Sequence, residues 1–155
     1  MALRKIVFDT DPQIRKKSKP VTEFDENLHE LLDDMKETMQ KADGVGLAAI
    51  QVGILKRVVI VEVNNMFLEL VNPEIVSSEG EQQNIEGCLS IQNCSGLVKR
   101  PATISVKALD RFGNNFMIVG TDYLAVALSH EIDHLDGILY TDKAIEIYRE
   151  GKKQE

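Results

Sequence analysis

Two histidines and a glutamate in the segment LSHEIDHLDG, residues 128–137, have a spacing that can perform metal chemistry. His130 and His134 are four residues apart, so a helix places both imidazoles on one face. Zn²⁺ and Fe²⁺ accept imidazole nitrogens as ligands, and Glu131 can take a proton from a water that such an ion activates. These residues alone predict either a hydrolytic metal site or a helix with ordinary polar side chains. His29 has no second ligand at helical spacing and is assigned no role.

A catalytic metal site needs a third protein ligand and an open position for water or substrate. The extended pattern of the zincin peptidases has a third histidine where this chain has Tyr140. A glutamate ligand would have to come from the short C-terminal segment, which offers little length to fold back. The thiolate of Cys88, in the segment IEGCLS, is therefore the best candidate. The alternative is that Cys88 is a small buried apolar residue, which is the more common role of a lone cysteine.

Two helices are predicted from apolar residues that recur with helical period. The later one begins near residue 121, carries the two histidines and ends near Gly137. The earlier one follows Asp25, which can cap its first turn, and ends before Gly44. Its apolar stripe consists of Leu28, Leu31, Leu32, Met35 and Met39. A short helix is also expected after Asp11, where Pro12 suits a first turn.

Strands are predicted between these helices. The segment KRVVIVEV (56–63) is rich in β-branched residues, and LELVNPEIV (68–76) indicates a strand that turns at Pro73. Residues 103–120 alternate on both sides of a turn at 110–115, which is typical of a hairpin. After the second helix, we expect a strand at 138–142 and a charged helix at 143–150. The order of elements predicts one α+β domain, residues 1–155, with a mainly antiparallel sheet.

The composition fits this reading. A chain of 155 residues that is 43% hydrophobic and 28% charged can bury a core without disulfides. It contains no signal-peptide pattern and no run of roughly 18 apolar residues, so we expect a cytoplasmic protein with no membrane partner and with reduced cysteines. The formal net charge of -7 argues against nucleic-acid binding.

Three separated segments resemble the signature motifs of the peptide deformylase family, in the family's order. They are GVGLAAIQVG (44–53), EGCLS (86–90) and HEIDHLDG (130–137). The resemblance extends through MALRKIV, DPQIRKKSKPV, NPEIV and RPATISVKALD, and so covers nearly the whole chain. It implies a deformylase-like fold and an enzyme that removes the N-formyl group from the initiator methionine of nascent polypeptides, releasing formate. It also implies one divalent metal per chain, with Fe²⁺ expected in the cell and Zn²⁺ as the alternative in purified protein.

Matching motif to motif assigns roles to individual residues. The implied metal ligands are Cys88, His130 and His134. Glu131 is implied as general base and acid, and the Gln51 side chain and the Leu89 backbone N–H are implied to polarise the formyl oxygen. The implied substrate-binding residues are Gly44, Val45, Gly46, Glu86, Gly87, Tyr123, Val126 and Ala127. Because GVG lacks bulk, a peptide can approach this backbone and pair as an added strand.

The chain departs from the family pattern at four positions. Ile50 and Gln92 stand where proline is usual, Ser129 where glutamine is usual, and Ser95 where some relatives have a substrate-contacting arginine. None of these departures removes a ligand, but contacts beyond the methionine are left open.

Three functions are therefore weighed: an active deformylase, a degenerate paralogue that binds formyl peptides without turnover, and a zincin-like endopeptidase. The third is disfavoured by the missing third histidine. For partners, we expect N-formylmethionyl peptides and a monomeric enzyme. Contact with the ribosome stays open, because the chain lacks the long basic extension with which some relatives dock there.

Overall fold

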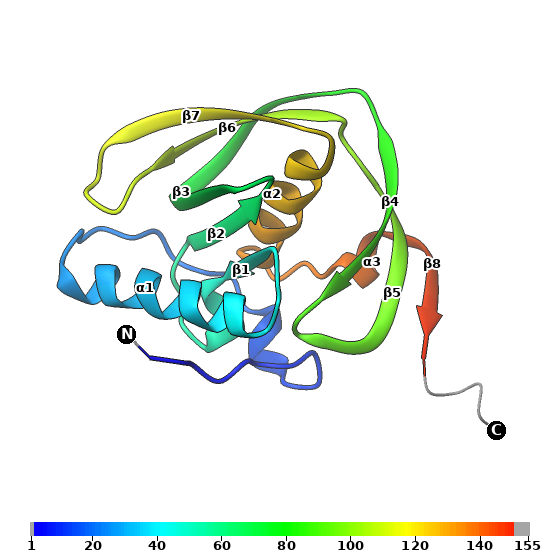
Figure 1. Cartoon of the computed structure of the whole chain (residues 1–155), viewed down its shortest axis with the longest axis horizontal. Coiled ribbons are helices and arrows are strands. Elements are labelled where there is room, and N and C mark those ends of the chain that lie inside the picture. Colours follow the sequence, from blue (N-terminus) through cyan, green and yellow to red (C-terminus); the bar gives the residue numbers. More distant parts are fainter. Residues whose placement is uncertain (1, 151–155) are drawn as a thin grey trace.

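The structure, a computed structural model, describes residues 2–150, which form two antiparallel sheets around a central helix (Figure 1). The first elements are the 3-10 helix η1 (Pro12–Arg15), helix α1 (Glu26–Lys41), strand β1 (Gly46–Ala48) and the 3-10 helix η2 (Ala49–Val52). The strands that follow are β2 (Val58–Val63), β3 (Met66–Glu79), β4 (Gln82–Cys88), β5 (Ile91–Arg100), β6 (Thr103–Leu109) and β7 (Asn115–Thr121). The last elements are α2 (Asp122–His134), α3 (Tyr140–Lys143) and β8 (Ala144–Arg149). The predicted α+β class is confirmed.

The larger sheet has the strand order β1-β2-β3-β6-β7, and the smaller one has the order β4-β5-β8. All strand pairs in both sheets are antiparallel. Strand β1 is an edge of the larger sheet and β4 is an edge of the smaller one. β1 begins at Gly46, the last residue of the GVG motif, and β4 ends at Cys88, in the EGC motif. Both edge strands lie near helix α2 (Figure 1).

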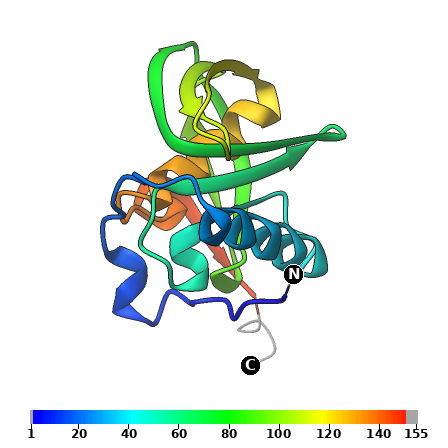
Figure 2. The ribbon, with the colours of Figure 1, turned by 90° about the vertical axis from the view of Figure 1, so that its left-hand side faces the viewer.

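The two main helices cover opposite faces of the larger sheet. Successive side chains of a strand point to opposite faces, and in β2 Val58 and Ile60 pack with α1 while Val59 and Val61 pack with α2. Figure 2 shows α1 on one side of these strands and the first turns of α2 on the other. Because α2 is buried along most of its length, its histidines are held in a fixed environment.

The helix boundaries follow the predicted caps. The Asp25 side chain accepts a hydrogen bond of 3.1 Å from the Leu28 N–H, and the Asp11 side chain accepts one of 2.9 Å from the Gln13 N–H. Gly137, just beyond α2, has a φ of 75°, and a side chain there would collide with the backbone carbonyl of Arg15. The predicted ends of both main helices are therefore confirmed to within a few residues.

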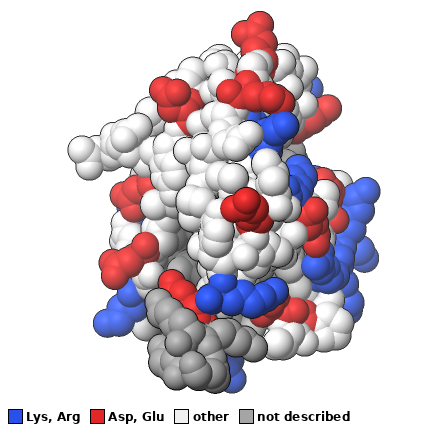
Figure 3. All heavy atoms as spheres, turned by 90° about the vertical axis from the view of Figure 1, so that its right-hand side faces the viewer, with Lys and Arg blue, Asp and Glu red and all other residues white. Residues whose placement is uncertain are grey.

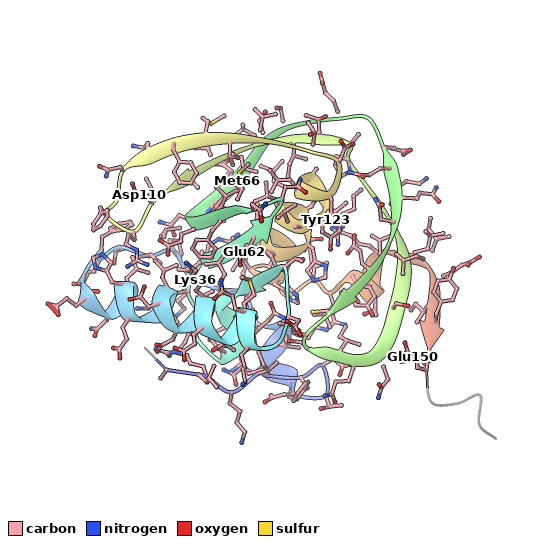
Figure 4. All side chains as sticks on the ribbon, in the orientation of Figure 1. Lys36, Glu62, Met66, Asp110, Tyr123 and Glu150 are labelled. Atoms are coloured by element: carbon pink, nitrogen blue, oxygen red, sulfur yellow. The ribbon has the colours of Figure 1, made fainter. Side chains whose placement is uncertain are left out.

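The predicted hairpin at 103–120 is confirmed by β6 and β7, which pair from Thr103↔Thr121 to Leu109↔Asn115. The side chain of Asp110, labelled in Figure 4, accepts hydrogen bonds of 2.9 Å from the N–H groups of Phe112 and Asn114. An aspartate that bonds the backbone two and four residues later stabilises this turn.

The predicted turn at Pro73 is wrong, because β3 continues through this residue to Glu79. The pairing of β3 with β6 shifts register between Val71 and Glu74, and Asn72 has a φ of 52°. The Asn72 side chain bonds both the N–H and the carbonyl of Val21, at 2.8 and 3.0 Å. A bulge therefore accommodates a proline that cannot donate to the ladder, and the strand bends without ending.

The order predicted for residues 138–150 is also wrong: a helical turn, α3, comes first and a strand, β8, follows. The Asp142 side chain accepts a hydrogen bond of 3.0 Å from the Leu139 N–H and forms an ion pair with Arg15, which stabilises the turn. Residues 144–149 pair with β5, with Ile147 opposite Gly96. Their β-branched and aromatic side chains suit this sheet edge better than a helix. Residues 151–155, which follow the predicted helix, lie outside the described part of the chain.

The face that carries β4, β5 and β8 has charges of both signs. Acidic side chains are scattered over it, and basic ones gather toward one edge among acidic neighbours (Figure 3). Among residues 2–150, no helix is both long and apolar enough to cross a membrane.

Candidate active site and metal centre

Three side chains that can bind a metal converge between β4 and α2. They are Cys88, His130 and His134, and one ligand atom of each lies within 4.8 Å of the other two. The Cys88 Sγ is 3.4 Å from the His134 Nε2, and the two imidazole centroids are 5.0 Å apart. A thiolate with two imidazoles suits Zn²⁺ and Fe²⁺, and three ligands leave a position open. The donor set of one thiolate and two imidazoles therefore fits a divalent metal.

A cleft of about 310 Å³ lies beside this cluster. Its lining includes all eight residues predicted to bind substrate, together with Gln51, Cys88, Leu89, His130 and Glu131. It also includes Asp43, which the sequence analysis missed although it directly precedes Gly44. Asp43 follows the end of α1 and has a φ of 58°. Its position at the cleft depends on this backbone turn and is not indicated by a sequence motif. His134 does not line the cleft and is buried.

Glu131 is buried beside the GVG motif. A Cβ atom at Gly46 would lie 2.6 Å from the Glu131 Oε2, so the glycine leaves the space that this carboxylate occupies. Its Oε1 has no hydrogen-bond partner among the described residues. Burial raises the pKa of Glu131 to about 7, because a carboxylate loses hydration there. A group with this pKa can both accept and donate a proton near neutral pH.

The two imidazoles have different electrostatic surroundings. Burial and the neighbouring His130 lower the pKa of His134 well below its ordinary value, so this ring is neutral. Burial also acts to lower the pKa of His130, but interactions with Cys88 and Glu86 outweigh it and raise this pKa to about 10. Metal binding requires neutral imidazole and therefore competes with the proton on His130.

Glu86 lines the cleft, but its carboxylate is bound to protein side chains. Burial acts to raise its pKa, while hydrogen bonds from Arg100 and His130 lower the pKa to about 2. The carboxylate is therefore ionised at neutral pH. Arg100 is not among the residues predicted from the sequence, because a buried ion pair has no local sequence signal.

Gln51 lies in η2 with an exposure of 1%, and its amide is oriented by its neighbours. Its Oε1 accepts a hydrogen bond of 2.9 Å from the Ala48 N–H. Its Nε2 is 3.0 Å from the Ser90 Oγ and 3.4 Å from the Cys88 Sγ. The donor end of the amide therefore faces the ligand cluster, as a donor to a substrate oxygen would require.

None of the four departures from the family pattern is among the residues that line the cleft. Ile50 is fully buried and packs in the apolar cluster between the sheet and α2, and Ser129 is buried within α2. Gln92 and Ser95 lie on β5.

Comparison with known proteins agrees with this geometry. The polypeptide deformylase family matches residues 3–150. The peptide deformylase of Acetivibrio thermocellus is 56% identical over 99% of this chain and 91% of its own length. The peptide deformylase of Alkaliphilus metalliredigens is 56% identical over 94% of this chain and 99% of its own. The chain belongs to the polypeptide deformylase family.

Solved structures give the same result. The crystal structure of a peptide deformylase from Legionella pneumophila has a TM-score of 0.88 and 46% identity, covering 91% of this chain and 85% of the other. The structure of peptide deformylase from Thermotoga maritima has a TM-score of 0.90 and 39% identity, covering 92% and 97%. The deformylase-like fold is confirmed. Deformylases are metal-dependent hydrolases that act on formylated peptides, and neither the zincin-like peptidase nor the degenerate paralogue is favoured.

Proposed function

We propose that the chain hydrolyses the formyl amide at the N-terminus of nascent polypeptides, with one divalent metal held by Cys88, His130 and His134. The observation that carries this proposal is the convergence of these ligand atoms within 4.8 Å, beside an open cleft. A divalent cation bound there supplies Lewis acidity, which makes water nucleophilic at neutral pH. The remaining steps depend on this chain's own side chains.

Glu131 handles the proton. Its buried carboxylate, with a pKa raised to about 7, takes a proton from the attacking water. It then delivers that proton to the amine of methionine as the C–N bond breaks and formate leaves. This role is consistent with its Oε1, which accepts no hydrogen bond from any described residue and is therefore free to bind a proton.

Two N–H donors stabilise the negative charge that develops on the formyl oxygen. One is the Nε2 of Gln51, whose orientation is fixed by the Ala48 N–H. The other is the backbone N–H of Leu89, which lines the same cleft. Donors that are held in place before the reaction stabilise such charge without reorganisation.

The formylated peptide binds as an added strand between the two sheets. β1 and β4 are edge strands; Val45, directly before β1, and Gly87, within β4, both line the cleft. The methionine side chain enters the part lined by Tyr123, Val126 and Ala127. Tyr123, which Figure 4 shows at the start of α2, is 46% exposed and so remains available to a ligand.

We propose Fe²⁺ as the metal in the cell and Zn²⁺ as the alternative in purified protein, because one thiolate and two imidazoles can bind either ion. The substrate is made on ribosomes, so we place the reaction in the cytoplasm, with transient ribosome contact at most. All proposed site residues come from one chain, so we propose a monomer as the active unit.

Incubation with formyl-Met-Ala, and separately with a longer unblocked peptide, tests the proposal. We expect formate from the first and no internal cleavage of the second. Cleavage of the unblocked peptide would indicate a peptidase. Tight binding of formyl-Met-Ala without formate release, with Fe²⁺ or Zn²⁺ supplied, would indicate a binding protein instead.

A further inference from the structure

A buried arginine lies behind the ligand cluster. Arg100 is the last residue of β5, and only 2% of its surface is exposed. Its Nε donates to the Glu86 Oε2 at 2.7 Å, and its Nη2 donates to the Glu86 Oε1 at 2.9 Å. Its Nη1 donates to the Asp133 Oδ2 at 2.7 Å, and the same oxygen is 2.9 Å from the Lys143 Nζ. The guanidinium thus contacts two carboxylates at once.

The carboxylate that Arg100 holds also contacts His130. The Glu86 Oε1 is 2.9 Å from the His130 Nδ1, and both side chains are buried. When this oxygen accepts the Nδ1–H, the free electron pair of the ring is on Nε2, which is the nitrogen left to bind a metal. The Nδ1 of His134 has no hydrogen-bond partner among the described residues. Within residues 2–150, a carboxylate therefore orients only one of the two imidazoles.

We propose that Arg100 is a positioning residue of the metal centre, which acts on His130 through Glu86. Its two parallel hydrogen bonds fix the plane of the Glu86 carboxylate, and so fix the direction from which His130 donates. The third bond reaches Asp133, which is three residues after His130 on α2, so Arg100 ties the ligand helix to β4 and β5. Only a planar guanidinium offers this fork together with a third donor, because a lysine ammonium acts as a point charge.

A purely structural role is the competing explanation, and the chain contains a second arginine fork for comparison, with an arginine side chain that is 22% exposed where that of Arg100 is 1% exposed. Arg111 binds Glu69 with the same fork, at 2.9 and 2.7 Å, and contacts the Asp33 Oδ1 at 2.9 Å. These residues join α1, β3 and the β6–β7 turn, and none of them lines the cleft or belongs to the ligand cluster. Loss of the Arg111 fork therefore reports what such a network contributes to folding alone.

This inference rests on the proposed metal site but not on deformylation, so it is tested by metal binding instead of formate release. The Zn²⁺ dissociation constant is measured by competition with a chromophoric chelator for the wild type, Arg100→Lys, Glu86→Gln and Arg111→Lys. We expect Zn²⁺ binding roughly 10- to 100-fold weaker in Arg100→Lys and Glu86→Gln, as for other residues that orient metal ligands, and unchanged in Arg111→Lys. The visible spectrum of bound Co²⁺ should shift only in the first two variants. Thermal unfolding of the metal-free proteins shows whether each is folded.

Wild-type Zn²⁺ affinity in Arg100→Lys and Glu86→Gln would overturn the proposal. Equal weakening in Arg111→Lys would overturn it as well, because the effect would then reflect general loss of stability. If Arg100→Lys does not fold, Glu86→Gln decides by the same comparison with Arg111→Lys. A wild type that binds no Zn²⁺ would contradict both this inference and the metal site, whereas absent formate release would contradict only the proposed activity.

Discussion

Glu131 is tightly packed against its neighbours, so single substitutions at or beside it can test its role. It lies against Gly46, it is buried, and its pKa is raised to about 7 by that burial. Gln51 lines the same cleft, and its amide nitrogen contacts Cys88 and Ser90. Predictions at the residue scale therefore concern these three residues, and they separate proton transfer, packing and charge stabilisation.

Replacing Glu131 with glutamine keeps the size of the side chain but removes its ability to accept a proton. We expect metal content to be retained and the turnover number on formyl-Met-Ala to fall by roughly 10² to 10⁴-fold, the usual contribution of a general base. Metal analysis and steady-state kinetics on the same sample measure both quantities. A variant with wild-type turnover would move the proton-transfer role to another group.

Gly46→Ala tests the space that Glu131 occupies. The added Cβ would stand 2.6 Å from the Glu131 Oε2, so the carboxylate must move. A displacement on the order of 1 Å in a catalytic group can cost about 10²-fold in rate, and we expect a loss of that order in turnover number with metal content unchanged. Kinetics that match the wild type would show that the position of the carboxylate is not critical.

The identity of Gln51 is tested by two substitutions. Gln51→Glu places a carboxylate near the Cys88 thiolate and the developing oxyanion, whereas Gln51→Asn only shortens the donor. We expect both to lower the turnover number, the first by more, with loss of the donor costing on the order of 10² to 10³-fold. The Michaelis constant should change much less. A Gln51→Glu enzyme as fast as the wild type, at equal metal content, would exclude this role.

At the element scale, what could be predicted depended on local periodicity. The stripe of α1, the ligand helix α2 and the β6–β7 hairpin have patterns within one segment, and all three were found. The bulge at Asn72 and the α3–β8 order were missed, because they depend on contacts with Val21, Arg15 and β5 that are distant in sequence. Arg100 was missed for the same reason: its contact with Glu86 depends on the pairing of β4 with β5, which no local pattern predicts.

The N-terminal segment is tied to α1 by a buried carboxylate. Asp34 accepts hydrogen bonds from the Ala2 N–H at 2.7 Å and from the Arg4 Nε at 2.9 Å. Burial acts to raise the pKa of Asp34, but these contacts outweigh it and hold the pKa below its ordinary value. Because the folded pKa is lower than the unfolded one, the contribution to stability is present above about pH 4 and is lost as the pH falls through the folded pKa.

Asp34→Asn should therefore destabilise the protein at pH 7, and the difference from wild type should shrink below about pH 4. Urea unfolding of the two proteins at a series of pH values measures this difference. A difference that stays constant from pH 7 to pH 3 would show that the charge of Asp34 does not carry the effect.

At the scale of the whole molecule, two sheets and a helix meet at one cleft. The larger sheet supplies β1, the smaller one supplies Cys88 from β4, and α2 supplies both histidines. Cys88 precedes His134 by 46 residues, so only the complete fold can bring the candidate ligands together. The motifs in the sequence were enough to predict the three candidate ligands. The distances between their ligand atoms could be obtained only from the structure.

The central claim is that a metal bound at Cys88, His130 and His134 is part of the enzyme, and metal content per chain tests it most directly. Cys88→Ser removes a charged ligand, while Cys94→Ser changes the other cysteine, which is buried in β5 and absent from the ligand cluster. We predict about one divalent metal per chain in the wild type and in Cys94→Ser, and loss or strong weakening of binding in Cys88→Ser. Equal metal content in the two variants would contradict the account.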